Sequence, residues 1–465
     1  MSGLFSTLNS SSMALGAHSR AIETTGKNLA NVNNPNYARQ RVVYGDRGTV
    51  DTGNGVQSLG LEVLSIAQLR DVLLDRQLLR EIGLSGSFEA QEQALQRAQA
   101  GLGQAINASG AATGGLAGSL DNFFNAFQSL AARPTDMGTR ETLLQQARIL
   151  TDTMRETDTR LAQIQTDLGA EVTADVSEVN RLIDTIAELN GQIARFEVNR
   201  PGVAVDLRDQ RQARLEELAA LLPVSVTDLG DGQVRLAVKD AGNADIILLD
   251  GQTVNGSVTF TGTGLTGGSP ATAIALSSGS IHGALDARDG AVQALRDNLD
   301  LFAEQLVTSV NAAYNPSSTP GEDFFDPAGL TAGTIAVRTG LTGATLVTGS
   351  SGAAGDNSIA IAVANIATQA FSTGSGDLID GTLGQFYSRS VSDLAQALST
   401  ATSRASDQDK IQQLVRNQRD TVSGVSLDEE MADLVRFQRA FQASSRVFSV
   451  VDELLDTVVN RLGRS

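Results

Sequence analysis

The sequence predicts a mainly α-helical protein with β insertions: paired terminal heptad helices, a long antiparallel helical rod domain, and one or more smaller outer β domains. Apolar residues recur every seventh position near both chain ends, as in helices that pack against other helices. Between Pro134 and Pro201 there is no proline, and apolar residues keep a helical three-four spacing. A Val-rich stretch after Pro223 alternates as a half-buried strand does. These features favour rod architecture over a compact enzyme.

The C-terminal segment, residues 423–462, carries the clearer seven-residue repeat. Ser426 and Glu429 precede it with the spacing of a capping box. A helix of about 36 residues is roughly 54 Å long, too long to bury one stripe by folding on itself. We therefore expect it to contact another long helix. The apolar positions are Leu427, Leu434, Phe437, Phe441, Phe448, Val451, Leu455, Val458 and Leu462.

The N-terminal segment is the candidate partner, because it has a seven-residue repeat of its own. The repeat ends before an Asn-rich turn around Pro35, which removes a donor and biases Asn34 away from helical geometry. Paired termini would leave the rest of the chain as an insertion between them. The alternative is two amphipathic helices packed separately on one globule, since surface helices commonly show such a stripe. The N-terminal repeat consists of Leu8, Leu15, Ile22 and Leu29.

The central segments alternate between helical and extended patterns. Residues 40–61 read as an extended linker or small hairpin, and 61–104 as mostly helical with a weak break near 83–86. The pattern over 136–199 predicts a very long helix whose seam shifts, or which breaks, near Gly169. Residues 334–376 are expected to contain short β runs. The predicted domains are 1–40 plus 423–465 (paired terminal helices), 41–222 plus 282–315 plus 378–422 (helical rod), 223–281 (outer β domain), and 316–377 (a Gly/Thr/Ala-rich loop and β insertion, separate or part of the outer domain).

Composition excludes several classes of function. A net charge of −18 opposes a nucleic-acid partner, which needs a basic surface. There is no cysteine for a disulfide or a thiolate metal site. No cleavable signal sequence and no run of about 18 apolar residues is visible, which argues against membrane insertion. Alone, these features indicate a cytoplasmic protein.

Motifs that could carry chemistry have simpler explanations. Residues 262–267 match G-x-G-x-x-G, but no helical pattern follows to meet a pyrophosphate. His18 and His282 are far apart in the sequence and have no evident partners. Three consecutive acids at 428–430 complement the dipole at a helix start. We expect no enzymatic activity, no catalytic residue, no cofactor and no metal site.

Residues 30–37, Ala-Asn-Val-Asn-Asn-Pro-Asn-Tyr, resemble the Ala-Asn-x-x-Thr-Pro-Gly-Tyr signature of bacterial flagellar rod, hook and hook-associated axial proteins. Asn34 and Asn36 depart from it, and Asn tolerates the positive φ that glycine allows. Residues 427–447 and 451–457 resemble the family's C-terminal signature. Patterns at 206–210 and 283–289 resemble the hook-associated members more than rod or hook subunits.

The resemblance implies a structural subunit of the flagellum at the hook–filament junction, secreted by the flagellar type III apparatus without a cleaved signal. It implies contacts with neighbouring copies, hook protein and the third hook-associated protein, and an export chaperone on the C-terminal helix. We expect one apolar seam to serve both the partner terminus and a neighbouring copy. The candidate packing residues are Leu8, Leu15, Ile22, Leu29, Leu434, Phe437, Phe441, Phe448, Val451 and Leu455, and the candidate turn residues are Ala30, Asn31, Pro35 and Tyr37.

Two other functions stay open at this point. One is a different flagellar axial subunit, from the hook or the distal rod. The other is a surface ligand-binding module carried in the β insertions.

Overall fold

The computed structural model describes residues 2–52, 55–58, 60–103, 105–106, 112–198, 200, 202–351, 353 and 355–458. The chain divides into two compact units. Unit 1 comprises residues 1–85, 176–279 and 408–465, and unit 2 comprises 86–175 and 280–407. Helices dominate and the sheets are antiparallel, which confirms the predicted mainly α fold class with β insertions. The four-part domain division stays a prediction.

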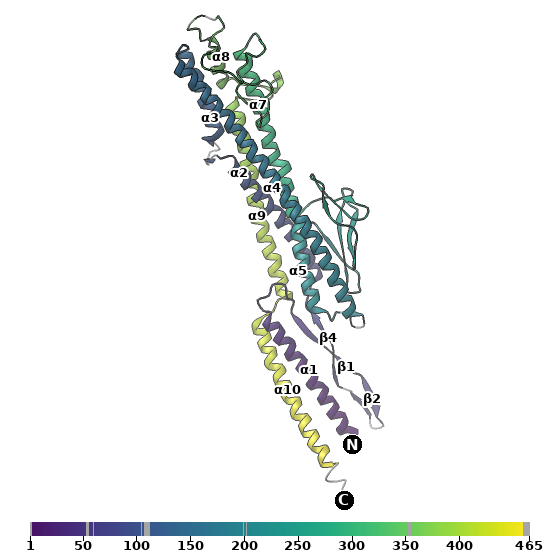
Figure 1. Ribbon diagram of the computed structural model, residues 1–465. Helices are drawn as coiled ribbons and strands as arrows, with labels where there is room; N and C mark the ends of the chain where they lie inside the picture. The colour runs from purple at the N-terminus through teal and green to yellow at the C-terminus, as the bar shows by residue number, and fades with distance from the viewer. Residues whose placement is uncertain are drawn as a thin grey trace. The chain divides into compact units, whose positions relative to one another are not determined.

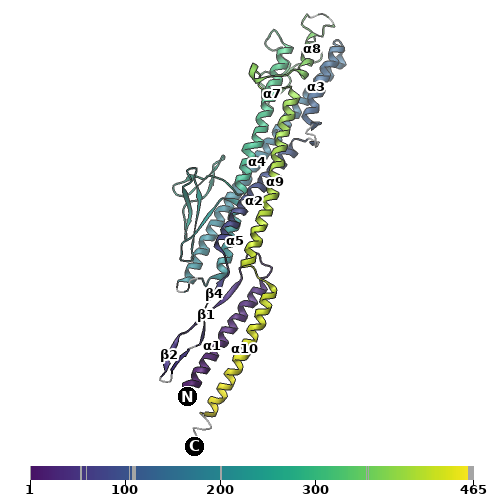
Figure 2. The same cartoon turned by 180° about the vertical axis from the view of Figure 1, so that it is seen from behind.

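Helices from the two chain ends lie side by side and antiparallel in unit 1 (Figures 1 and 2). They are α1 (Ser2–Ala30) and α10 (Leu427–Asp456). Ala17 and Ala21 of α1, with Val451 and Leu455 of α10, are the buried apolar residues of this pair. Leu462, the last position of the predicted repeat, lies outside the described residues.

Two hairpin-like pairs follow α1. Strand β1 (Gln40–Asp46) pairs antiparallel with β4 (Leu61–Gln68), and β2 (Thr49–Thr52) pairs with β3 (Gly55–Ser58). The helical prediction for 61–68 is therefore wrong. Exposure alternates along the start of β4, as in a strand. The backbone of β4 is hydrogen-bonded to β1, and this pairing cannot be read from the local pattern of apolar residues.

Helix α2 (Val72–Gly101) passes through residues 83–86 without the predicted break. Gly83 serves close packing instead: a Cβ there would lie 3.0 Å from the Ala219 carbonyl oxygen, and the Gly83 carbonyl accepts a bond from Gly279 N at 2.7 Å. The glycine is needed for the approach of neighbouring backbone, not for a turn.

Helix α4 (Met137–Glu197) is continuous through Gly169, which decides between the two sequence-based alternatives. Its first part, to residue 175, belongs to unit 2 and the remainder to unit 1. In each unit its apolar stripe is buried, as at Leu150 and Leu161 in unit 2 and Val179 and Ile186 in unit 1. Residues 199 and 201, just after this helix, lie outside the described part of the chain.

The β region of unit 1 follows helix α5 (Val205–Leu221). A four-stranded antiparallel sheet has the order β10-β9-β8-β7, and a three-stranded sheet has the order β11-β12-β13. Leu236 and Val238 of β8 and Leu248 and Leu249 of β9 are buried. The strands are β7 (Ser225–Asp228), β8 (Val234–Lys239), β9 (Asp245–Asp250), β10 (Thr253–Val254), β11 (Thr259–Phe260), β12 (Leu265–Gly267) and β13 (Thr272–Ala273).

Unit 2 has an aromatic core and one region that differs from expectation. The described residues of 334–376 hold helix α8 (Ser358–Asn365) and isolated bridges such as Phe371 to Gly381, and they do not form the expected β runs. Ile359, Ala360 and Val363 share a buried helical face, so the short apolar run forms a helix. The aromatic core comprises Phe123, Phe124, Phe127, Tyr314, Phe324 and Phe325.

The other elements of unit 2 are α3 (Gly115–Ala132), α6 (Ser280–Asp286), a π-helical turn (Ala287–Val292), α7 (Gln293–Tyr314), α8 (Ser358–Asn365), two 3₁₀ turns (Ile366–Thr368 and Thr373–Ser375) and the short pair β5 (Ala105–Ile106) with β6 (Ala112–Thr113). Helix α9 (Leu383–Ser423) contributes to both units.

Candidate assembly site on the terminal helices

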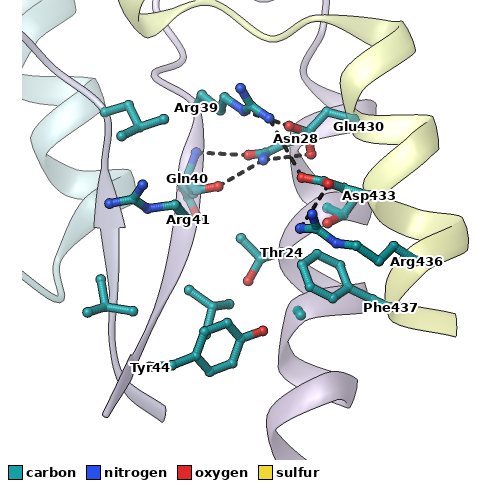
Figure 3. A pocket seen from close by; sticks show the side chains of 15 residues that line it. Thr24, Asn28, Arg39, Gln40, Arg41, Tyr44, Glu430, Asp433, Arg436 and Phe437 are labelled. Carbon is teal, nitrogen blue, oxygen red and sulfur yellow. Dashed lines mark hydrogen bonds and ion pairs between the residues drawn. The ribbon is translucent and has the colours of Figure 1, made fainter. Parts of the chain in front are cut away.

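A buried amide ties the end of α1 to the start of β1 and of α10 (Figure 3). Asn28 is 1% exposed, and its Nδ2 donates to the Gln40 carbonyl oxygen and to Glu430 Oε2, both at 2.9 Å. Its Oδ1 accepts from Gln40 N at 3.0 Å and from the Tyr37 hydroxyl at 2.8 Å. The amide thus uses its full hydrogen-bonding capacity. We call Asn28, Tyr37, Arg39, Gln40 and Glu430 the polar junction.

Glu430 is the buried charge of the polar junction, with 2% of its surface exposed. Arg39 Nε donates to Glu430 Oε1 at 2.7 Å, and Arg39 Nη1 donates to Glu429 Oε2 at 2.6 Å. Burial lowers the pKa of Arg39, but Glu430 and Glu429 outweigh it and raise this pKa above its ordinary value. The buried carboxylate is therefore both paired and hydrogen-bonded, as a charge removed from water must be.

The predicted capping box is wrong. Ser426 takes the extended conformation of an N-cap, but its side chain makes no capping hydrogen bond. Glu429 instead pairs with Arg39, the residue before β1, whose guanidinium lies at the start of α10. The acids at 428–430 thus do more than complement the helix dipole, which is all that the sequence predicts for them.

The turn at residues 31–37 is held by contacts from other segments. The Pro35 carbonyl accepts from Arg419 Nη2 at 3.0 Å, and the Asn36 carbonyl accepts from Arg70 Nη2 at 3.4 Å. Among described non-glycine residues, positive φ occurs only at Asn243 and Ser318. Asn36 therefore stands at the glycine position of the signature without adopting the left-handed conformation, so the turn does not use the tolerance of Asn for positive φ.

The other predicted turn residues have different surroundings. Ala30 and Pro35 are exposed, whereas Asn31 and Tyr37 are half-buried. Asn31 Nδ2 donates to the Lys27 carbonyl oxygen at 3.0 Å. Burial first, and then the carboxylates of Asp209, Asp206 and Glu430, raise the pKa of the Tyr37 phenol well above its ordinary value. Tyr37 is thus held as a neutral donor to the polar junction.

Beside the polar junction, α1, β1 and α10 enclose a hollow of about 580 Å³ (Figure 3). Arg436 lies over the ring of Phe437 with 4.9 Å between its guanidinium carbon and the ring centroid. The buried Tyr44 hydroxyl oxygen makes no hydrogen bond to a described residue, and burial raises its pKa. Apolar and polar groups alternate around this hollow, which suits protein contacts better than a defined small-molecule pose.

The predicted packing residues differ in their exposure. Val451 and Leu455 are buried, and Phe441 is 37% exposed. The others are half-buried: Leu8, Leu15, Ile22, Leu29, Leu434, Phe437 and Phe448. Their role in contacts with other subunits stays a prediction.

A second group of apolar residues on α10 is exposed, and of this group Leu427 alone belongs to the predicted repeat. Because they are exposed, these residues are accessible to another protein, and the contact of the predicted seam with a neighbouring copy stays a prediction. The other five lie outside the predicted repeat, where a helix that packs against one partner needs no large apolar residue, and this was the signal in the sequence. The outer apolar set comprises Leu427, Met431, Val435, Val447, Val450 and Leu454, each at least 43% exposed.

The glycine pattern and the two histidines of the sequence lie in surroundings that the structure describes. Residues 262–267 belong to the β11–β12 hairpin, which ends in another strand and not in a helix. Burial lowers the pKa of His18, and His282 Nδ1 lies 2.9 Å from Ser87 Oγ. Across the described residues, no three His, Cys, Asp or Glu side chains gather as a metal would require. Among the described helices, none has the length and apolarity needed to cross a membrane.

Family models match two parts of the chain. The flagellar hook-associated protein FlgK helical domain matches residues 102–325, and the flagellar basal body rod FlgEFG protein C-terminal domain matches 417–462, which includes all of α10. Flagellar hook-associated protein 1 of Bacillus subtilis (strain 168) is 26% identical, over 100% of this chain and 99% of the relative. Over its full length the chain is similar to flagellar hook-associated protein 1.

Two further proteins are similar to this chain over different extents. Flagellar hook-associated protein 1 of Escherichia coli (strain K12) is 22% identical, over 98% of this chain and 99% of its own. A solved structure of the flagellar hook junction protein FlgK from Burkholderia pseudomallei is 20% identical, with a TM-score of 0.47, over 54% of this chain and 46% of that one. The family is one of structural flagellar proteins.

Proposed function

We propose that this chain is a structural subunit of the bacterial flagellum that assembles at the junction between hook and filament through its terminal helices. The observation that carries the proposal is the state of α10, which buries one face against α1 and leaves the outer apolar set exposed. A large exposed apolar surface on a soluble protein typically marks a contact with another protein. The names of the full-length relatives support the same assignment.

Copies of the chain would associate head to tail, so that the outer apolar set of one copy contacts a different surface of the next. Such heterologous contacts generate rings or helical assemblies, as an axial structure requires. Hook protein and the third hook-associated protein are the proposed neighbours at the two ends of this assembly. Burying six large apolar side chains supplies the association energy that a half-buried helix pair lacks in the free chain.

Before assembly the exposed face of α10 needs protection in the cytoplasm. We therefore include an export chaperone that binds α10, followed by transit through the flagellar type III apparatus without a cleaved signal. The chaperone and the neighbouring subunits would compete for the same apolar residues. The packing residues predicted from the sequence, including Phe441, contribute where they stay accessible beside α1.

The test replaces Val450 and Leu454, one helical turn apart, with Asp. Both side chains are exposed, at 57% and 48%, so the variant keeps the α1–α10 contact. The matched control replaces the exposed Gln438 and Gln442 with Asp, which adds the same charge at the same spacing. We expect the apolar variant to lose incorporation at hook tips in cells lacking the native chain, and the control to retain it. Wild-type incorporation by the apolar variant would refute the proposal.

A second candidate is another axial position, in the hook or the distal rod. It is favoured by the match of residues 417–462 to a rod-protein domain. Labelled antibody along isolated flagella separates the two: one band at the hook–filament junction supports the junction role, and a continuous coat supports the alternative.

A further inference from the structure

Unit 1 contains a small hollow rich in arginine, away from the terminal helices. Residues of α2, α5, β7 and β8 enclose about 120 Å³ between them. A cavity needs a volume of roughly 10–15 Å³ to hold one water molecule, so this one has room for several waters or one small ion. Four arginines line it, in a chain whose net charge is −18: Arg70, Arg76, Arg208 and Arg211. We call this site the arginine hollow.

Two of the four arginines have carboxylate partners. Arg70 pairs with Asp75 at 3.2 Å and with Asp209 at 2.6 Å. Arg208 makes a two-pronged pair with Glu197, at 2.9 Å and 2.7 Å. Their charges are therefore compensated inside the protein.

Arg211 is different, because it is buried without a carboxylate partner. It is 6% exposed, and its Nη1 donates to Asn190 Oδ1 at 2.8 Å and to the Gly232 carbonyl oxygen at 2.6 Å. Its Nε and Nη2 make no hydrogen bond to a described residue. Burial first, and then the charge of Arg208, lower the pKa of Arg211 to about 10. A buried charge in this state gains strongly from a counter-ion.

Arg76 supplies a second positive charge without a partner. It lines the arginine hollow from the first turns of α2, is exposed, and forms no ion pair with a described carboxylate. The acidic residue facing the hollow from β7 is Asp228, which is exposed and accepts a bond from Gly230 N at 2.8 Å. Two uncompensated guanidinium groups thus face one solvated carboxylate.

We propose that the arginine hollow binds a small tetrahedral oxyanion, of the phosphate or sulfate class, between Arg211 and Arg76. The planar fork of a guanidinium matches the paired oxygens of such an anion. The bound anion would lie against α5 and the first strands of the β region, and would tie these elements to α2 within unit 1. The site is separate from the outer apolar set on α10.

The test is a titration of the full-length chain with phosphate and with sulfate, at ionic strength held constant with chloride, followed by thermal unfolding in far-UV circular dichroism. The variants are Arg211→Met and Arg76→Gln, and the control is Arg195→Gln, an exposed arginine of α4 that does not line the hollow. A tenfold excess over Kd should raise Tm by roughly 2–4 °C in the wild type and the control. The two hollow variants should lose most of this rise.

The control variant separates binding from general salt effects, because phosphate and sulfate stabilise most proteins by exclusion from the surface. An equal rise in all four proteins would overturn the proposal, as would no rise in any. Arg211→Met leaves Asn190 without a charged donor and can fail to fold, which its circular dichroism spectrum shows directly. In that case Arg76→Gln, at an exposed position, decides the question alone.

Discussion

Replacing Glu430 with Ala tests whether the polar junction holds α10 on α1. The carboxylate is 2% exposed and accepts from Asn28 Nδ2 and Arg39 Nε. Its removal leaves a buried amide donor unpaired, which costs about 1–3 kcal/mol. Arg39 keeps Glu429 and Asp433 as partners, and its side chain is 21% exposed. Losing Glu430 therefore costs less for Arg39 than losing the partner of a fully buried ion pair would. We expect the Glu430→Ala variant to destabilise the α1–α10 contact by about 2–3 kcal/mol in total.

Amide hydrogen exchange in α10 measures this contact directly, because separation from α1 exposes the helix to solvent. A loss of about 2–3 kcal/mol corresponds to roughly 30- to 150-fold faster exchange. The matched control is Glu429→Ala. Its side chain is 63% exposed, so the lost ion pair is worth only about 0.2–1 kcal/mol. Equal, small accelerations in both variants would refute the reasoning that Glu430 is the anchor.

Two further substitutions test other parts of the structure. Tyr37→Phe removes the bond to Asn28 and should cost about 1 kcal/mol in urea unfolding near neutral pH. Because burial and nearby carboxylates raise the pKa of this phenol, the wild type should lose stability as pH rises above about 10, and the variant should lose less. Gly283→Ala should destabilise unit 2 by roughly 3 kcal/mol or more in thermal unfolding, because a Cβ would lie 1.9 Å from the Ser87 carbonyl oxygen. Gly290→Ala, with nothing within 4 Å, is the control and should be neutral or slightly stabilising.

Elements with a long local period could be predicted from the sequence. The helical spacing between Pro134 and Pro201 becomes α4, and the heptad segments become α1 and α10. The fold class and the family signatures follow from the same local information. Each of these features depends on residues within a few turns of one another, which is the range over which side-chain periodicity acts.

Short segments with long-range partners could not be predicted in this way. Residues 61–68 form a strand because β1 offers them a hydrogen-bonding edge, although their apolar residues also fit a helix. Residues 334–376 form turns and a short helix because their apolar side chains are buried in unit 2. In both cases the pairing or burial partner, and not the local pattern, decides the conformation.

The polar junction shows the same limit for the candidate site. The seven-residue repeats predict where the N-terminal helix ends, before the turn at residues 31–37, and where α10 begins. Only the tertiary structure brings Asn28 within 2.9 Å of Glu430, 402 positions later in the chain. An acidic residue at a helix start has a sufficient local explanation in the helix dipole. Its burial against an amide and a guanidinium depends on three segments meeting, and no periodicity within any one of them encodes that meeting.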